Sequence, residues 1–340
     1  MPARNIWVKQ LFLVSVVAAS SAWAVDARAT VAISGLNILP TFDSTIINDP
    51  NAAAIESTID NAISIYHQDF SNPVNVPIYF TEMNTGLGQS SDSLTSVNYS
   101  DFRSALASEP NSAVRTTALQ YLPNQANEPV PNTTGSSLWL SAADANALVV
   151  SGQLSSSYFS SPQYDGTISL NTSITYTGST GSPNTYSLET VVMHEIDEVL
   201  GLGSALPNYG TSNGLNAPRP EDLYRYAADG TRSFSTSATG SVYFSLNGTT
   251  DLAQFNNTNN GGDYGDWASN PLPAGASPQV QDAFITGDQN ITLGSNEFAA
   301  LQAIGYVQVP DPATIALLAG GLLAALTLSP RKRSTRYNAA

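Results

Sequence analysis

Alternation of apolar and polar residues marks the strands expected in this chain. The period of two is clear in "TVAISGLNIL", in "NVPIYFTEM" and, most strictly, in "DGTISLNTSITY". Such alternation is typical of strands with one buried face. It predicts strands over residues 30–39, 75–83 and 165–176, the last of them at the edge of a sheet. Further short strands and turns are expected in 240–255.

Apolar residues three or four positions apart mark the helices. The run over 49–70 has Asp49 as the expected N-cap and Pro50 in the first helical position. A closing helix is predicted over 294–306, where Phe298, Leu301 and Ile304 recur at helical spacing. Three shorter helices, each opened by a serine that can cap it, are predicted at 100–109, 112–122 and 141–148.

The order of these elements indicates the fold class. Helices and strands are mixed without a regular βαβ repeat, and no long linker divides the chain. We therefore expect an α+β fold with one domain over 25–309. A chain of this size can bury a substantial core without disulfides, and it contains no cysteine.

The N-terminus has the pattern of a secretory signal peptide. Arg4 and Lys9 precede an apolar run over 11–19, and small residues stand at Ala22 and Ala24. A basic, then apolar, then small-residue order is typical of a cleavable export signal. We expect residues 1–24 to be removed and the protein to be exported across the inner membrane, to the cell envelope or beyond.

The C-terminal residues 310–340 form a second predicted targeting segment. A Pro-Asp-Pro turn precedes an apolar run over 313–329, and Arg331 begins a basic cluster. The run is near the lower length limit for a membrane span. This arrangement resembles the PEP-CTERM tail of Gram-negative bacteria, which implies an exosortase-type processing enzyme as partner and transient membrane anchoring. A plain tail anchor is the alternative.

The charge of the segment between the two ends excludes some partners. Residues 30–309 contain no lysine and five arginines against 25 acidic residues, a formal charge of −20. Such a field repels nucleic acid and attracts cations. We therefore expect no nucleic-acid binding. We also expect a monomer.

The stretch "SLETVVMHEIDEVLGLGSAL", residues 187–206, contains the candidate chemistry. On a helix, His194 and Glu198 lie one turn apart on one face, and Glu195 lies beside them. Two ligands at this spacing can hold a metal while the glutamate between them takes a proton from water. The alternative is a buried core helix whose acidic side chains are solvated.

The motif resembles the metzincin pattern H-E-x-x-H-x-x-G-x-x-H. His194, Glu195 and Gly201 are in register, whereas Glu198 stands at the second histidine position and Ser204 at the third. Together with "PEDLYRYAADGTRSF" and "NNGGDYGDW", it resembles exported bacterial zinc metalloproteases. The resemblance implies a zincin-like fold with a mixed sheet, an active-site helix and a C-terminal helix. It also implies zinc, and a protein or peptide substrate.

No histidine follows His194, so a third ligand would have to be oxygen. A downstream acid completes several zinc sites of this kind, and Asp222 is the choice that the resemblance suggests, with Glu221 and Ser204 as alternatives. Two carboxylates and one histidine leave the metal near zero net charge. We therefore expect weakened or retuned hydrolysis, and a preference moved from zinc toward manganese or calcium.

A glycine-rich loop, "NNTNNGGDYGDW", carries other oxygen ligands. Asn257, Asn259, Asp263 and Asp266 could hold calcium at a separate site, although a solvated turn explains the loop equally well.

Two functions are consistent with the whole sequence. The first is an exported metallopeptidase in which His194, Glu198 and Asp222 bind zinc or manganese and Glu195 is the general base. The second is a non-catalytic envelope or biofilm-matrix protein that retains the scaffold.

Overall fold

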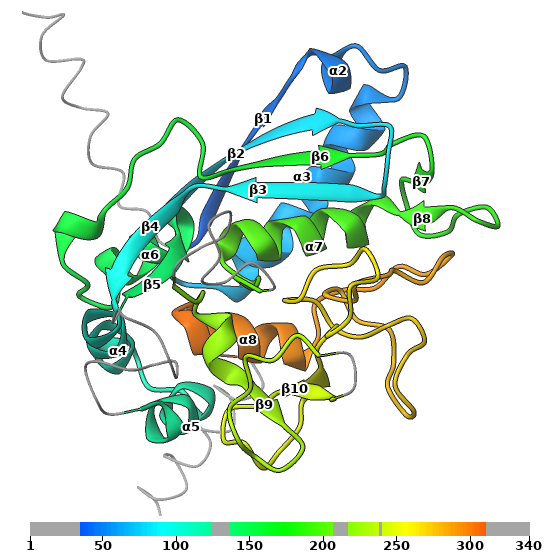
Figure 1. Cartoon of the computed structure of the whole chain (residues 1–340). Helices are drawn as coiled ribbons and strands as arrows, with labels where there is room; N and C mark the ends of the chain where they lie inside the picture. Colours follow the sequence, from blue (N-terminus) through cyan, green and yellow to red (C-terminus); the bar gives the residue numbers. More distant parts are fainter. Residues whose placement is uncertain (1–34, 124–136, 207–216, 238–239, 311–340) are drawn as a thin grey trace, which may run out of the picture.

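A mixed four-stranded sheet organises the first half of the protein (Figure 1). The computed structural model describes residues 35–123, 137–206, 217–237 and 240–310. The strand order is β1-β2-β6-β3. The first three strands are parallel, and the edge strand β3 runs antiparallel to β6. Their bounds are Asn37–Phe42 for β1, Asn75–Glu82 for β2, Gly166–Leu170 for β6 and Gly88–Asp92 for β3.

Two long helices cover one face of this sheet. Helix α3 (Ala52–Asp69) packs against helix α7 (Leu188–Leu200), which in turn contacts β3 and β6. The alternation of the sequence explains which face they cover. Ile78 and Phe80 of β2 are fully buried, whereas Tyr79 between them is partly exposed. A sheet with one covered and one more open face agrees with the α+β class.

A smaller layer stands at one end of the sheet. Strand β4 (Leu94–Asn98) pairs antiparallel with β5 (Ser137–Ser141). Three helices belong to this layer: α4 (Tyr99–Ser108), α5 (Ala113–Tyr121) and α6 (Ala142–Val150). The predicted serine caps are present on α5, where Ser112 accepts from the Arg115 N–H, and on α6, where Ser141 accepts from the Asp144 N–H.

The last third of the chain is rich in loops around a second small sheet. This antiparallel sheet contains β9 (Arg225–Ala227), β10 (Val242–Phe244) and β11 (Ala253–Gln254). Phe244, Phe255 and Trp267 pack together behind it. Helix α8 (Ser295–Ile304) closes the described chain, as its spacing predicted.

Five short elements complete the description. They are helix α2 (Ser44–Ile47), two 3₁₀ turns (Ser156–Tyr158 and Glu221–Tyr224) and a pair of two-residue strands, β7 (Thr175–Tyr176) and β8 (Tyr186–Ser187).

The structure corrects two of the expected elements and adds one that was not expected. The first long helix begins at Ala52 with Asn51 at the N-cap, because Asp49 instead accepts the Asn51 N–H in the preceding turn. The strand expected over 165–176 ends at Leu170 and lies inside the sheet rather than at its edge. The true edge strand, β3, is "GQSSD", which has neither alternation nor strand-forming residues and so gave no signal.

Both predicted targeting segments fall outside the described residues, apart from Pro310. Within the described residues, no helix has the length and apolar character needed to cross a membrane.

Candidate metal centre

Helix α7 presents the two motif residues that the sequence singled out. The hydroxyl of Ser187 caps its first turn, and Gly201 ends it with a φ of 126°, a conformation that favours glycine. The apolar residues of α7 are buried, which fixes its rotation about its own axis. His194 and Glu198 therefore face the same way, with side chains 12% and 15% exposed.

A third residue comes from the glycine-rich loop. His194 Nε2 lies 3.9 Å from Glu198 Oε1 and 3.9 Å from Asp266 Oδ1. One donor atom from each of the three residues lies within 4.8 Å of the others, so the group could hold a metal ion. A tetrahedral site with bonds of about 2.1 Å has donor atoms about 3.5 Å apart. The two distances from His194 Nε2 exceed this spacing by about 0.4 Å, so the side chains would have to draw together to surround one ion.

A hydrogen bond orients His194 for such a role. His194 Nδ1 lies 2.9 Å from the Val280 carbonyl oxygen. Because a carbonyl can only accept, Nδ1 donates this hydrogen bond, and Nε2, which faces the two carboxylates, is the nitrogen left to bind a metal. Metal-binding histidines are commonly fixed in this way by an acceptor on the other ring nitrogen.

The edge strand orients Glu198. Ser90 on β3 donates a 2.6 Å hydrogen bond from its hydroxyl to Glu198 Oε2. This contact leaves Oε1 facing His194. The strand that gave no signal in the sequence thus supplies a positioning group for a ligand.

Glu195 lies in the same pocket and is only 4% exposed. A Cβ atom at Gly88 would overlap its carboxyl group, so the edge strand approaches Glu195 closely only because residue 88 is glycine. Burial, followed by the charge of Glu198, raises the pKa of Glu195 well above its usual value. Its Oε2 has no hydrogen-bond partner among the described residues.

The electrostatics of the cluster favour a cation. Burial is the main cause that raises the pKa values of Glu198 and Asp266, and for Asp266 the charges of Glu198 and Asp263 add to it. Several buried carboxyl groups therefore repel one another. A divalent cation would favour their charged forms, and this donor set of one imidazole and two carboxylates suits such an ion.

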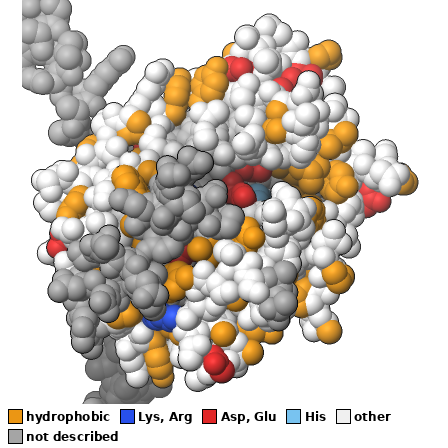
Figure 2. Space-filling model, viewed as in Figure 1, with side chains coloured by type: hydrophobic (Ala, Val, Ile, Leu, Met, Phe, Trp, Pro, Cys, Tyr) orange, Lys and Arg blue, Asp and Glu red, His pale blue; other side chains and the backbone are white. Residues whose placement is uncertain are grey.

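The cluster opens to solvent through a hollow of about 340 Å³. Figure 2 shows acidic and histidine side chains together at its mouth. Met83, Ser90 and Gly262 contribute to its walls from segments far apart in the sequence.

The structure does not bring the predicted third ligand, Asp222, into the cluster. Its carboxylate accepts hydrogen bonds from the Ser204 hydroxyl (2.5 Å), the Ala205 N–H (2.9 Å) and the Arg219 N–H (3.0 Å). The alternative ligand Glu221 accepts from the Gly203 N–H at 2.5 Å. Asp222, Glu221 and Ser204 thus hold together the loop after α7, and Asp266 takes the position in the cluster expected for Asp222.

The loop with the expected calcium ligands is not a separate site, because Asp266 belongs to the cluster. Asn257 is occupied elsewhere: its Oδ1 accepts from Arg225 and its amide donates to the Ser237 carbonyl. The acidic and glycine-rich composition of this loop was the signal in the sequence that could have identified Asp266 as a ligand.

No protein family matches the chain, and no curated protein and no solved structure is detectably similar to it. The candidate metal centre is therefore supported by its own geometry.

Proposed function

We propose that this protein is an exported, metallopeptidase-like hydrolase with a zincin-like fold. The observation that carries the proposal is the convergence of His194, Glu198 and Asp266 in one hollow with the carboxyl group of Glu195. The resemblance of "HEIDEVLGLGS" to the metzincin motif supports the same reading, as does the packing of α7 against a mixed sheet with an antiparallel edge strand.

The three ligands would hold zinc or manganese. A divalent metal bound there would supply a Lewis acid that polarises a peptide carbonyl and lowers the pKa of water. His194 would bind through Nε2, and Ser90 keeps one oxygen of Glu198 directed at the cluster. The two carboxylates offset the charge of the ion, so hydrolysis would be slower than at a site with two histidines.

Glu195 is the residue that we assign as general base. Its carboxyl group lines the hollow beside the three candidate ligands, and its Oε2 has no hydrogen-bond partner in the described part of the chain. Burial, followed by the charge of Glu198, raises the pKa of Glu195, and a carboxylate with a raised pKa is a stronger base toward water. Glu195 would take the proton of the attacking water and return it to the leaving amine.

The test compares Glu195→Gln with the wild type and with Glu189→Gln, a matched change in the first turn of the same helix. Metal content is measured by mass spectrometry, and proteolysis is measured with fluorescently labelled casein. We expect equal metal content in all three proteins and loss of hydrolysis in Glu195→Gln alone. A wild type that binds metal but cleaves no casein would contradict the proposal and favour a non-catalytic envelope protein.

A further inference from the structure

Two cavities adjoin each other on the loop-rich part of the chain, away from the hollow of the metal centre. Their volumes are about 680 Å³ and 420 Å³, within the range in which proteins bind small molecules. Gln254, Ala268, Pro273 and Ala274 line both of them. We call the two cavities together the neutral groove, defined by these four shared residues.

The lining of the neutral groove contrasts with the rest of this acidic chain. Among the described residues, its walls contain one charged side chain, Asp251, and no cation. The smaller hollow of the metal centre, by comparison, is lined by four carboxylates. The remaining polar groups of the groove are amides and hydroxyls. A site without cations has no means of pairing with phosphate, sulfate or uronate groups, so its chemistry favours a neutral ligand.

Several of these neutral polar groups are free to bind. Tyr243 and Gln254 are paired positions on β10 and β11, and both side chains are partly exposed while the neighbouring Phe244 and Ala253 are buried. In the described part of the chain, neither the Tyr243 hydroxyl nor the Gln254 amide has a hydrogen-bond partner. The strand pair thus directs two unsatisfied polar groups out of the core.

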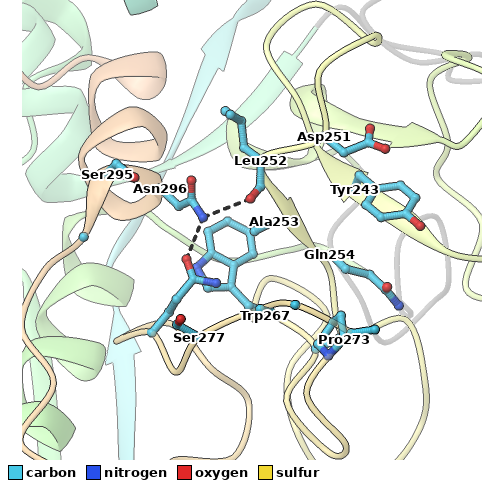
Figure 3. A pocket seen from close by; sticks show the side chains of 16 residues that line it. Tyr243, Asp251, Leu252, Ala253, Gln254, Trp267, Pro273, Ser277, Ser295 and Asn296 are labelled. Atoms are coloured by element: carbon cyan, nitrogen blue, oxygen red, sulfur yellow. Dashed lines mark hydrogen bonds between the residues drawn. The ribbon is translucent and has the colours of Figure 1, made fainter.

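The opposite wall is fixed by its own hydrogen bonds. The Asn296 amide nitrogen donates to the Leu252 carbonyl at 3.0 Å and to Gln279 Oε1 at 2.6 Å. These bonds leave the Asn296 oxygen as an acceptor and the Gln279 nitrogen as a donor. Figure 3 shows Asn296 on one side, Tyr243 and Gln254 on the other, and Trp267 between them.

We propose that the neutral groove binds an uncharged oligosaccharide. A sugar hydroxyl both donates and accepts hydrogen bonds, and amides and hydroxyls provide both partners. The ring of Tyr243 and the apolar Pro273 offer surfaces for the C–H faces of a sugar, with a polar tip at the tyrosine hydroxyl. Two adjoining cavities fit at least two linked sugar units better than one isolated unit.

The groove and the candidate metal centre have separate linings, but some of their residues are neighbours in the sequence. Trp267 follows Asp266, and Gln279 precedes Val280, which accepts the hydrogen bond of His194. A bound glycan would therefore hold the protein with its metal hollow near a polysaccharide surface. Glycan binding does not require hydrolysis, so this inference goes beyond the proposed function and can hold if that function fails.

Affinity electrophoresis of the full protein tests the proposal. Native gels contain dextran, hydroxyethylcellulose or galactomannan as neutral probes and alginate as an anionic control. We expect at least one neutral polysaccharide to retard the protein, with or without EDTA, and alginate to leave it unaffected. Absence of retardation in all three neutral gels would overturn the proposal, as would equal retardation by alginate or a loss of binding with EDTA.

Variants locate the binding. Gln254→Ala and Tyr243→Ala are each expected to raise the dissociation constant about tenfold or more. Tyr243→Phe keeps the ring and should raise it by a smaller factor. Gln68→Ala, an exposed glutamine on α3, is the matched control and should bind as the wild type does. Thermal denaturation verifies that each variant is folded. Unchanged binding in both Gln254→Ala and Tyr243→Ala would show that the glycan lies elsewhere and overturn the assignment.

Discussion

Two aspartates distinguish the candidate metal centre in the structure from the one that the sequence suggested. Asp266 lies in the cluster with His194 and Glu198, and Asp222 is held by three hydrogen bonds in the loop after α7. We predict that Asp266→Asn removes the stabilisation by added metal, whereas Asp222→Asn retains it.

The expected rise in melting temperature follows from the linkage between metal binding and folding. A metal at 100 times its dissociation constant stabilises the folded state by about 2.7 kcal/mol. For a domain of this size each kcal/mol raises the melting temperature by about 2–4 °C. Zinc or manganese added to metal-free wild type should therefore raise it by about 5–10 °C. The Asp266→Asn protein should show a small fraction of this rise.

Without metal, Asp266→Asn should be the more stable of the two variants and Asp222→Asn the less stable. Burial and the charges of Glu198 and Asp263 raise the pKa of Asp266, so the charged form is costly in the metal-free fold. A neutral asparagine removes that cost, and the metal-free Asp266→Asn protein should melt at or above the wild-type temperature. Asp222→Asn turns an amide donor toward backbone N–H groups. Loss of a charge-assisted hydrogen bond costs about 1.5–3 kcal/mol, so this variant should be less stable than the wild type by about that amount.

The assay is differential scanning fluorimetry of EDTA-treated proteins, with zinc or manganese returned in a titration. The result that would refute the reasoning is a normal metal response in Asp266→Asn together with a lost response in Asp222→Asn. Elemental analysis of the same samples verifies that the response reports bound metal.

Three further predictions test other parts of the structure. Ser90→Ala should weaken metal affinity about 10–100-fold by releasing Glu198, measured by competition with a metal-binding dye; an unchanged affinity would remove Ser90 from its positioning role. Burial raises the pKa of Glu221 to about 8, so the folded state holds its proton longer than the unfolded state does, and its contribution to stability falls as pH rises from about 4.5 to about 8. Urea unfolding in EDTA at pH 5 and at pH 8 measures how much stability is lost between these two pH values. This loss should be smaller in Glu221→Gln than in the wild type, by up to about 3 kcal/mol. An identical loss in the two proteins would contradict the buried environment of Glu221. Gly88→Ala should destabilise the fold by about 1–3 kcal/mol, because its methyl group overlaps Glu195; equal stability in denaturant would show that the strand can move aside.

The regular elements with strong periodicity were predictable from the sequence. The helices over 52–69 and 295–304 and strand β2 follow their hydrophobic patterns because one face of each is buried. Capping serines also predicted the starts of α5 and α6. These signals are local, since they depend on residues within a few positions of one another.

By itself, the sequence determined which face of α7 carries the candidate ligands. His194 and Glu198 are four residues apart on a capped amphipathic helix, and helical geometry alone places them together. The acidic character of the chain and the absence of cysteine were equally plain.

The third candidate ligand and the groups that position the other two were decided by tertiary structure. Asp266 is 72 positions from His194, Ser90 is 108 from Glu198, and the Val280 carbonyl is 86 from His194. No periodicity links residues so far apart. A choice between Asp222 and Asp266 requires knowing which backbone N–H groups need an acceptor, and this depends on how the loops pack. The neutral groove has the same origin, because its walls come from strands, loops and a helix terminus that only the folded chain brings together.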